Sequence, residues 1–385
     1  MQGQKLTFQE KILKHRLTTI YRVALGIVLL IAVILVIRIQ IENKVYTGFE
    51  IVRSVDGVGS KESKAQIYNG NVLYYSRDGV SAYDSTGKQL WNQTYEMQSP
   101  IVSVAGEYVV AGDYKGNTIY IMNGSGLCGQ ININKVLLDL SVSEKGVVTA
   151  TLDDDTTTWL DIYNSEGENI VSIKTSMNQS GYPLKTSMSP DNQKMAVAYL
   201  KAEGNGIGTS LAFYNFGDVG QNVTDKIVSG YDYEDMVIPF LHYINENDAV
   251  AVGERQLLIY GGKQIPELRN SANIEEGVKS VYWGDSLVAL VYLNDDSEDK
   301  YRLDVYDMNA KLVLSQTFDV EYNNIVLANG NIIIYNEASV YIWNKKGLEK
   351  YNGDLGGGIK TIIPTNSKTK YIVVRNEGLE LIKLK

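Results

Sequence analysis

Hydrophobic residues follow two different patterns along the chain. Residues 23–37 form one uninterrupted apolar run, VALGIVLLIAVILVI, which is bracketed by Arg22 and Arg38. As a helix, residues 19–41 are long enough to cross a hydrocarbon core of about 30 Å. After this segment, short β-branched and aromatic runs alternate with Gly, Asn and Asp, and no long helical periodicity appears. The pattern therefore predicts one transmembrane helix, residues 19–41, followed by an all-β domain.

The basic residues around the apolar run predict its orientation. Five of them precede the run and two closely follow it: Lys5, Lys11, Lys14, Arg16 and Arg22 before, Arg38 and Lys44 after. The positive-inside rule then makes residues 1–18 a cytoplasmic tail and places the rest of a single-pass cell-membrane protein outside the cytoplasm. A cleaved signal peptide is the alternative for such a run. The long segment before the run, and the lack of a small-x-small cleavage site after it, favour an uncleaved anchor.

The all-β part of the sequence contains a repeat. Eight similar units have second strands that start near Val72, Tyr108, Val147, Met195, Ala249, Leu287, Ile332 and Tyr371. Units of about 40–45 residues with four short strands are the signature of a β-propeller. The repeat predicts eight blades, with seven as the alternative if one weak unit is misread.

The ends of the repeat region predict how the ring closes. The last unit stops after three strands, at Leu384, while residues 49–57, FEIVRSVDG, form a spare strand after a linker over residues 42–48. We expect this strand to become the outer strand of the C-terminal blade, which would remove an open sheet edge. The predicted propeller therefore spans residues 49–385.

The turns between the third and fourth strands support the same fold. In four units, Asp or Asn is followed three residues later by Gly: Asp84 and Gly87, Asn123 and Gly126, Asn164 and Gly167, Asn344 and Gly347. Asp or Asn caps a type I turn through its side chain, and Gly supplies the positive φ that returns the chain to the next strand. Asn215 and Asp307 lack this Gly.

One of these turns carries a family resemblance. The stretch from Asp84 to Trp91, DSTGKQLW, is similar to the D-x-x-G-K-x-x-W element of quinoprotein-type propeller repeats, in which the Trp docks between neighbouring blades. The whole chain resembles a family of single-span, WD40-like propeller proteins of Gram-positive-type bacteria, a domain of unknown function. The resemblance implies the fold and the membrane placement. Propellers with such repeats include a scaffold of the outer-membrane barrel-assembly machinery and quinone-dependent dehydrogenases.

The side chains needed for catalysis are scarce. The chain has two His residues, His15 and His242, and one Cys, Cys128. His242 lies in an apolar run typical of an inner strand, and neither it nor Cys128 has a recognisable catalytic or zinc partner in sequence. We expect no cofactor, no metal and no enzymatic activity. Residues 43–385 carry 30 basic and 43 acidic residues, which argues against nucleic acid as a partner.

The acidic residues are concentrated in one class of loop. In a propeller, the loops between second and third strands emerge on one face, and here they are mainly acidic. The connection GYDYEDM (residues 230–236) should reach the same face. The predicted docking face consists of Asp153, Asp154, Asp155, Tyr231, Tyr233, Asp295, Asp296, Glu298 and Asp299. Acidic loops attract basic segments, and Tyr rings offer rigid contact area.

These observations predict a non-catalytic scaffold that is held in the bilayer by residues 19–41 and binds a protein partner in the cell envelope. A degenerate quinoprotein-type enzyme and a sensor of a small ligand or wall polymer are the alternatives.

Overall fold

The computed structural model describes residues 8–155, 157–176, 180–203, 206–294 and 298–385. The chain forms two compact units, one that contains the N-terminal helix and ends at Tyr46, and one that spans Thr47–Lys385. The helix α1 covers Phe8–Asn43. Its segment His15–Ile37 is long and apolar enough to cross a membrane, as either a membrane anchor or a signal sequence would be.

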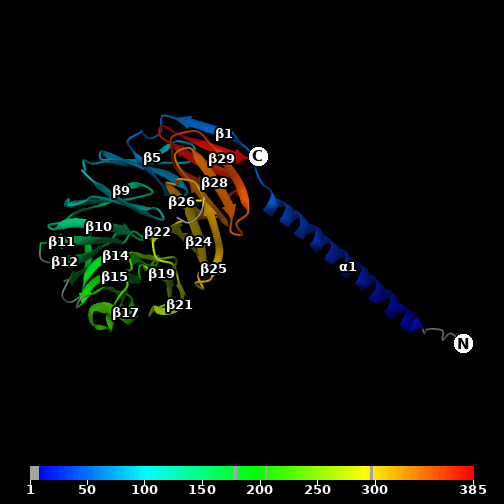
Figure 1. The fold of residues 1–385 in the computed structure, drawn as a ribbon, viewed down its shortest axis with the longest axis horizontal. Coiled ribbons are helices and arrows are strands. Elements are labelled where there is room, and N and C mark those ends of the chain that lie inside the picture. Colours follow the sequence, from blue (N-terminus) through cyan, green and yellow to red (C-terminus); the bar gives the residue numbers. More distant parts are fainter. Residues whose placement is uncertain (1–7, 156, 177–179, 204–205, 295–297) are drawn as a thin grey trace. The chain divides into compact units, whose positions relative to one another are not determined.

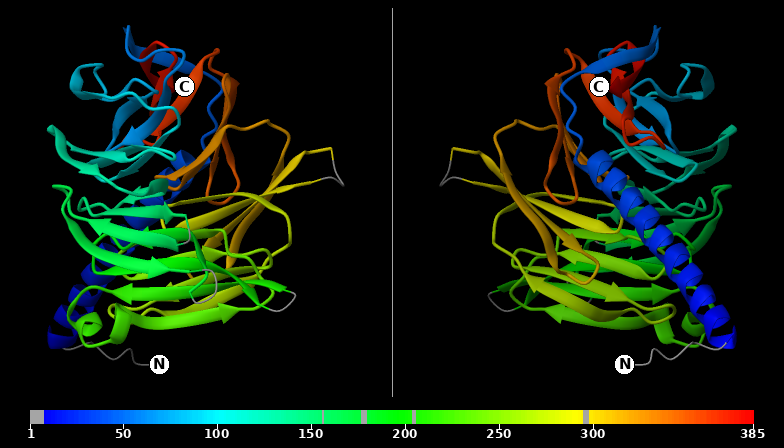
Figure 2. Two further views of the ribbon diagram at one scale, coloured as in Figure 1. Left: turned by 90° about the vertical axis from the view of Figure 1, so that its left-hand side faces the viewer. Right: turned by 90° about the vertical axis from the view of Figure 1, so that its right-hand side faces the viewer.

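The second unit contains eight four-stranded antiparallel sheets, so the predicted eight-bladed β-propeller is confirmed. In Figure 1 the colours pass around the ring from β1, in blue, to the last strands, in red, which lie beside it. The two side views of Figure 2 show the sheets of neighbouring blades lying one against the next. Strands one to four of a blade follow each other in sequence from the inside of the ring to the outside in blades 1 to 7.

The strands of blades 1 to 4 are β2 (Lys64–Tyr68), β3 (Asn71–Tyr75), β4 (Gly79–Tyr83), β5 (Gln89–Thr94); β6 (Pro100–Ala105), β7 (Tyr108–Asp113), β8 (Thr118–Asn123), β9 (Gly126–Asn132); β10 (Val136–Val142), β11 (Val148–Asp154), β12 (Thr157–Tyr163), β13 (Asn169–Thr175); β14 (Tyr182–Met188), β15 (Lys194–Glu203), β16 (Gly206–Asn215) and β17 (Ile227–Tyr233). Short helices, α2 (Asp218–Gln221) and η1 (Thr224–Lys226), precede β17.

The strands of blades 5 to 8 are β18 (Phe240–Tyr243), β19 (Asp248–Val252), β20 (Gln256–Gly261), β21 (Glu267–Asn273); β22 (Val278–Gly284), β23 (Leu287–Leu293), β24 (Tyr301–Asp307), β25 (Leu312–Phe318); β26 (Asn324–Ala328), β27 (Asn331–Tyr335), β28 (Ser339–Asn344), β29 (Glu349–Asp354); β30 (Ile359–Pro364), β31 (Lys370–Arg375), β32 (Gly378–Leu384) and β1 (Phe49–Asp56). The outer strand of blade 8 is thus β1, which pairs antiparallel with β32 from Phe49↔Leu384 to Asp56↔Gly378.

The hydrophobic core lies between the blades. The second strands are buried along most of their length, and the clusters that they form with third-strand residues join neighbouring blades. Trp91 illustrates this packing: it projects from β5, contacts the Tyr68 ring edge-on at 5.7 Å between centroids, and belongs to a cluster that includes Val109 and Met122 of blade 2. The Trp therefore docks between two blades, as the repeat motif implies.

The polar turn residues act as predicted. Asp84 Oδ1 accepts hydrogen bonds from the backbone N–H groups of Thr86 and Lys88, at 2.7 and 3.1 Å, and Asn123, Asn164 and Asn344 make equivalent bonds. Asp307 does the same without the Gly, because Ala310 adopts a φ of +56° in its place. This residue occupies a left-handed conformation that normally favours Gly.

Every outer strand carries a β-bulge. The register shifts by one residue where the third strand meets the fourth in all eight blades, for example between Ala82 and Tyr83 in blade 1 and between Ile51 and Arg53 in β1. Bulges increase local twist and make an exposed edge a poor template for another strand. The repeated bulge thus protects the outer wall of the ring.

Candidate functional site

The strand order divides the propeller into two faces. Turns between strands 1 and 2 and between strands 3 and 4 lie on one face, which we call the hairpin face. Loops between strands 2 and 3, and the connections between blades, lie on the other, which we call the loop face. Because β1 begins opposite the end of β32, the chain enters the propeller on the hairpin face.

The loop face is the more acidic of the two. Its described loops and connections, outside the strands, contain fifteen Asp or Glu residues and six Lys or Arg residues. Several of the basic side chains are already bound within the protein. Lys300 pairs with Glu321 at 2.9 Å, and Lys135 pairs with Asp161 at 3.3 Å. The excess negative charge therefore remains available to attract a cationic partner.

The predicted docking residues lie on or near this face but in three different blades. Asp153 and Asp154 end β11 of blade 3, and Asp155 follows with a φ of +51°. In blade 6, Glu298 is exposed, and the Asp299 carboxylate accepts a hydrogen bond from the Thr317 hydroxyl. Asp295 and Asp296 lie outside the described residues.

The two predicted tyrosines have a partly structural role. Tyr231 and Tyr233 belong to β17, the outer strand of blade 4, and both are half-buried against the core between blades 4 and 5. The Tyr231 ring lies 5.0 Å from the Tyr260 ring, and the hydroxyls of Tyr233 and Tyr260 are hydrogen-bonded. Burial raises the pKa of Tyr233, so its hydroxyl stays neutral.

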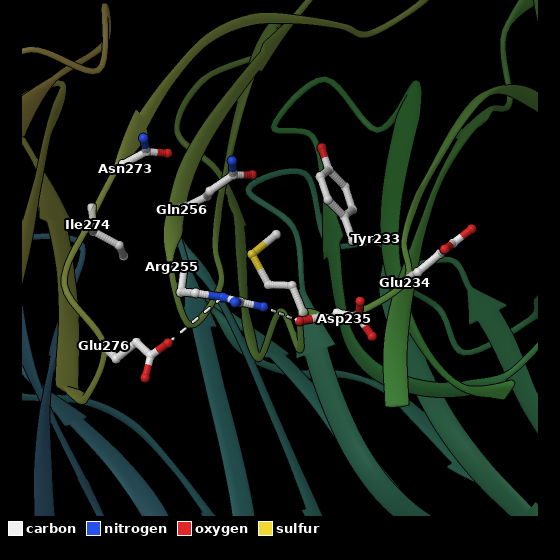
Figure 3. Close-up of a pocket in the computed structure, with 9 residues that line it drawn as sticks. Tyr233, Glu234, Asp235, Arg255, Gln256, Asn273, Ile274 and Glu276 are labelled. Atoms are coloured by element: carbon white, nitrogen blue, oxygen red, sulfur yellow. Dashed lines mark hydrogen bonds and ion pairs between the residues drawn. The ribbon is translucent and has the colours of Figure 1, made fainter. Parts of the chain in front are cut away.

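A groove of about 610 Å³ lies on this face, over blades 4 and 5 (Figure 3). Three segments build it: the connection after β17, the loop between β19 and β20, and the connection after β21. Its lining residues are Tyr233, Glu234, Asp235, Met236, Arg255, Gln256, Asn273, Ile274 and Glu276. Tyr233 is the one predicted site residue among them.

The groove combines an apolar floor with a charged rim. Met236 and Ile274 are 6% and 9% exposed and belong to the cores on either side of blade 5. Arg255 crosses the groove, where its guanidinium donates to the carbonyl oxygen of Asp235 at 2.5 Å and lies 3.9 Å from the Glu276 carboxylate. The lining contains three carboxylate residues, Glu234, Asp235 and Glu276, against one basic residue, Arg255, so the rim is acidic overall.

The central channel is a second hollow, of about 550 Å³, lined by the inner strands of blades 2 to 6. His242, on the inner strand β18 as predicted, stacks on Trp283 with ring centroids 4.4 Å apart. Lys185 and Asp139 form an ion pair of 3.2 Å on the same wall. Burial, together with the positive charge of Lys185, lowers the pKa of His242 from 6.5 to about 4, so the imidazole is neutral at pH 7.

Acid should therefore destabilise the propeller through His242. The pKa in the folded state lies below that of an unfolded His, so between pH 6.5 and pH 4 the unfolded chain binds the proton more tightly and stability falls as the pH is lowered. Replacing His242 with Gln is expected to flatten this part of the Tm-versus-pH curve. Thermal unfolding of both proteins from about pH 7 to about pH 4 measures the difference. Parallel curves would show that His242 does not contribute.

Cys128 is not set up as a nucleophile. It occupies the bulge of β9, half-buried, where its thiol contacts the carbonyl oxygens of Ile121 and Ser165 at 3.4 and 3.5 Å. Burial raises the pKa of the thiol, which keeps it protonated at neutral pH. Among the described residues, no group of three His, Cys, Asp or Glu side chains is arranged to hold a metal ion.

The fold is an eight-bladed β-propeller, and it is similar in architecture to propellers of known structure. BamB from Moraxella catarrhalis superposes with a TM-score of 0.53 at 11% identity, over 88% of this chain and 98% of BamB. Sqt1 from Chaetomium thermophilum, solved bound to the N-terminus of the ribosomal protein L10, superposes with a TM-score of 0.55 at 12% identity, over 88% of this chain and 100% of Sqt1. Such identities establish a shared fold.

Residues 42–384 match DUF5711, a family of unknown function, and the chain belongs to this family. No curated protein sequence is significantly similar to it.

Sequence reasoning missed most of the groove. Arg255, Gln256, Asn273, Ile274 and Glu276 are ordinary loop and strand-end residues, and they become neighbours of Tyr233 only through blade packing. The one available signal was the acidic and aromatic connection at residues 230–236, which supplies four of the nine lining residues.

Proposed function

We propose that this protein is a non-catalytic scaffold of the cell envelope, anchored in the membrane by α1, whose loop face binds a basic segment of a partner protein. The observation that carries the proposal is the groove over blades 4 and 5, which is acidic at its rim and apolar at its floor.

The composition of the groove supports a peptide-like ligand. A Lys or Arg side chain of a partner would meet the carboxylates of Glu234, Asp235 and Glu276, while an adjacent apolar side chain would cover Met236 and Ile274. Tyr233 adds a ring whose hydroxyl is already fixed by Tyr260. A closed propeller holds such groups in place, so little order has to be created on binding.

The placement of the chain supports the same function. The apolar segment His15–Ile37 is long enough to span a bilayer, and the excess of basic residues before it favours a cytoplasmic N-terminus. The propeller would then lie outside the cytoplasm. Its groove is on the loop face, whereas β1 begins on the hairpin face.

Photocrosslinking in intact cells tests the proposal. A photoreactive residue at Gln256 should crosslink to a defined envelope protein, and the substitutions Glu234→Gln, Asp235→Asn and Glu276→Gln together should reduce that crosslink by about tenfold because they remove the rim charge. The yield of the crosslinked band, normalised to the amount of folded protein, is the measurement.

A matched control comes from the opposite face. Glu107, Glu144 and Glu166 are exposed on turns of blades 2 and 3 on the hairpin face, and replacing them with Gln removes the same charge. This variant should keep the parental crosslink. If both triple variants lost the same fraction of the crosslinked band, the net charge of the protein would account for the loss and the groove would not be the docking site. An unchanged yield in the groove variant would refute the groove as the docking site.

A further inference from the structure

The hairpin face has an uneven charge distribution. Outside the strands, the turns of blades 2 to 6 on this face contain nine acidic and four basic residues. The corresponding segments of blades 7 and 8 contain no acidic residue, and they carry four lysines: Lys345, Lys346, Lys368 and Lys385. We call these four residues the basic sector. It is an exception in a propeller whose residues 43–385 have a net charge of −13.

The geometry points to a membrane contact: we infer that the basic sector rests on the headgroups of anionic phospholipids beside the anchor. The inference depends on the membrane-anchoring part of the proposed function and is independent of the groove and its partner.

A continuous series of hydrogen bonds joins the segments that carry these lysines. The backbone N–H of Lys345 donates to Gly330 O at 3.1 Å, and the side chain of the adjacent Asn329 donates to Thr365 O at 2.9 Å. The N–H of Leu384 donates to Thr369 O at 2.9 Å. The turns of blades 7 and 8 and the end of β32 therefore hold the lysines in one part of the hairpin face.

The chain enters the propeller in the same place. The backbone N–H groups of Thr47 and Gly48 donate to Lys385 O, and the N–H of Lys385 donates to Gly48 O. The segment that leads from α1 therefore joins the ring beside the basic sector. In a membrane-anchored protein this point of attachment stays close to the bilayer surface.

The turn that carries Lys345 and Lys346 has the composition of an interfacial tip. Its sequence is Lys-Lys-Gly-Leu, and Leu348 is 37% exposed. The Asn344 side chain fixes its shape, accepting hydrogen bonds from the N–H groups of Lys346 and Leu348 at 2.9 and 3.0 Å. Basic residues next to an exposed aliphatic residue suit the boundary between headgroups and acyl chains.

The strand ends next to the basic sector carry both signs of charge. Lys350, Lys370 and Lys383 add three positive charges, and Glu50 and Glu349 add two negative ones. Glu50 is shared by Lys383 and Lys385, at 3.6 and 2.5 Å. The side-chain charge of this part of the face is therefore +5.

The energetics are sufficient for a tethered domain. A Lys near an anionic membrane surface contributes about 1 kcal/mol, and the attraction falls off within a Debye length of about 8–10 Å. Four such residues would be weak as an isolated anchor, but a tether raises their effective concentration at the bilayer. The acidic turns of blades 2 to 6 would be repelled, so the contact would favour blades 7 and 8.

The test uses the full chain in lipid nanodiscs, with Cys128→Ser and a fluorophore on a single Cys at Asn366, in the same turn as Lys368. Quenching by a headgroup-labelled lipid should be about threefold stronger with phosphatidylglycerol than with phosphatidylcholine alone, and about 0.5 M NaCl should abolish the difference. Lys345→Glu, Lys346→Glu and Lys368→Glu together should also abolish it. A fluorophore at Gln221, in blade 4, should report weak quenching throughout.

The control variant reverses Lys145, Lys263 and Lys311 to Glu, since these three lysines lie on the hairpin face of blades 3, 5 and 6. It should behave like the parent. Equal quenching in both lipids, or no effect of reversing the basic sector, would overturn the inference. Retained binding of soluble polyphosphate without lipid-dependent quenching would overturn it as well, because the ligand would then be a dissolved polyanion.

Discussion

A chain that lacks residues 47–57 is expected to lose its folded propeller. These residues include β1, the outer strand of blade 8, which pairs with β32 along its whole length. Without β1, the buried side chains of Leu379 and Ile382 lose their cover and β32 becomes an open, unbulged edge. Exposing two or three large apolar side chains costs about 5 kcal/mol, which is comparable to the whole stability of a domain.

The junction between blades 8 and 1 would fail at the same time. Tyr74 of blade 1 donates to the carbonyl oxygens of Arg375 and Gly378, at 3.1 and 3.3 Å. Val55 of β1 packs in the cluster that contains Tyr74, and Arg53 donates to Ser85 O at 2.5 Å. Removal of β1 therefore weakens the contact that closes the ring. Size-exclusion chromatography and limited proteolysis should show an aggregated or rapidly digested product.

A permuted chain is the matched control. Because β32 ends where β1 begins, residues 48–57 can be attached after Lys385 through a two-residue Asn-Gly turn, which gives blade 8 the same order of strands as the other seven blades. The permuted propeller should be monomeric and protease-resistant. If it failed like the deletion, the covalent link from β1 to β2 would be essential and pairing with β32 would be insufficient.

Lys135→Met is expected to lower the stability of the propeller. Lys135 lies between blades 2 and 3, and its ammonium group is 3.3 Å from Asp161 Oδ2. The Asp161 side chain is 5% exposed, and its other oxygen, Oδ1, has no hydrogen-bond partner in the described part of the chain. Removing the cation would leave a buried carboxylate without its counter-charge, which costs about 3 kcal/mol. We expect Tm to fall by about 4 °C for a propeller of this size.

Two further variants separate the ion pair from the surrounding packing. Adding Asp161→Asn to Lys135→Met removes the buried charge. In the parent protein the Tyr163 hydroxyl donates to Asp161 Oδ2 at 3.2 Å, and the amide oxygen of Asn can accept the same hydrogen bond. Most of the stability should therefore return. Lys174→Met is the control, since the ammonium groups of Lys135 and Lys174 both lie over the Trp159 ring, at 4.8 and 5.7 Å, yet Lys174 is exposed. It should change stability by less than about 1 kcal/mol. Equal effects of Lys135→Met and Lys174→Met would refute the charge argument.

Much of the fold was predictable because its signals are local. The Asp84–Gly87 turn and its equivalents at Asn123, Asn164 and Asn344 each form within five residues, and their hydrogen bonds have the predicted pattern. The eight repeats could be counted for the same reason. Asp307 shows the limit of this reasoning: it caps the same turn, but Ala310 replaces the expected Gly with a strained φ that the surrounding blade maintains.

The candidate site was much less predictable. The acidic character of the loop face follows from strand order and composition. The groove does not, because Arg255, Ile274 and Glu276 meet Tyr233 only across the boundary between two blades. The orientation of Tyr231 and Tyr233 was equally hidden, since it depends on Tyr260, a residue of the next blade.

The apolar helix, a propeller of eight or seven blades and the negative charge of its loop face could be derived from the sequence alone, because hydrophobic period, turn chemistry and net charge act over short stretches of chain. Three arrangements became evident only in the folded protein: which loop residues form the groove, the pairing of Lys135 with Asp161, and the grouping of the lysines of blades 7 and 8 where the chain enters the ring. Those arrangements depend on how neighbouring blades pack, and residues that meet in this way are separated by tens of positions and share no local pattern.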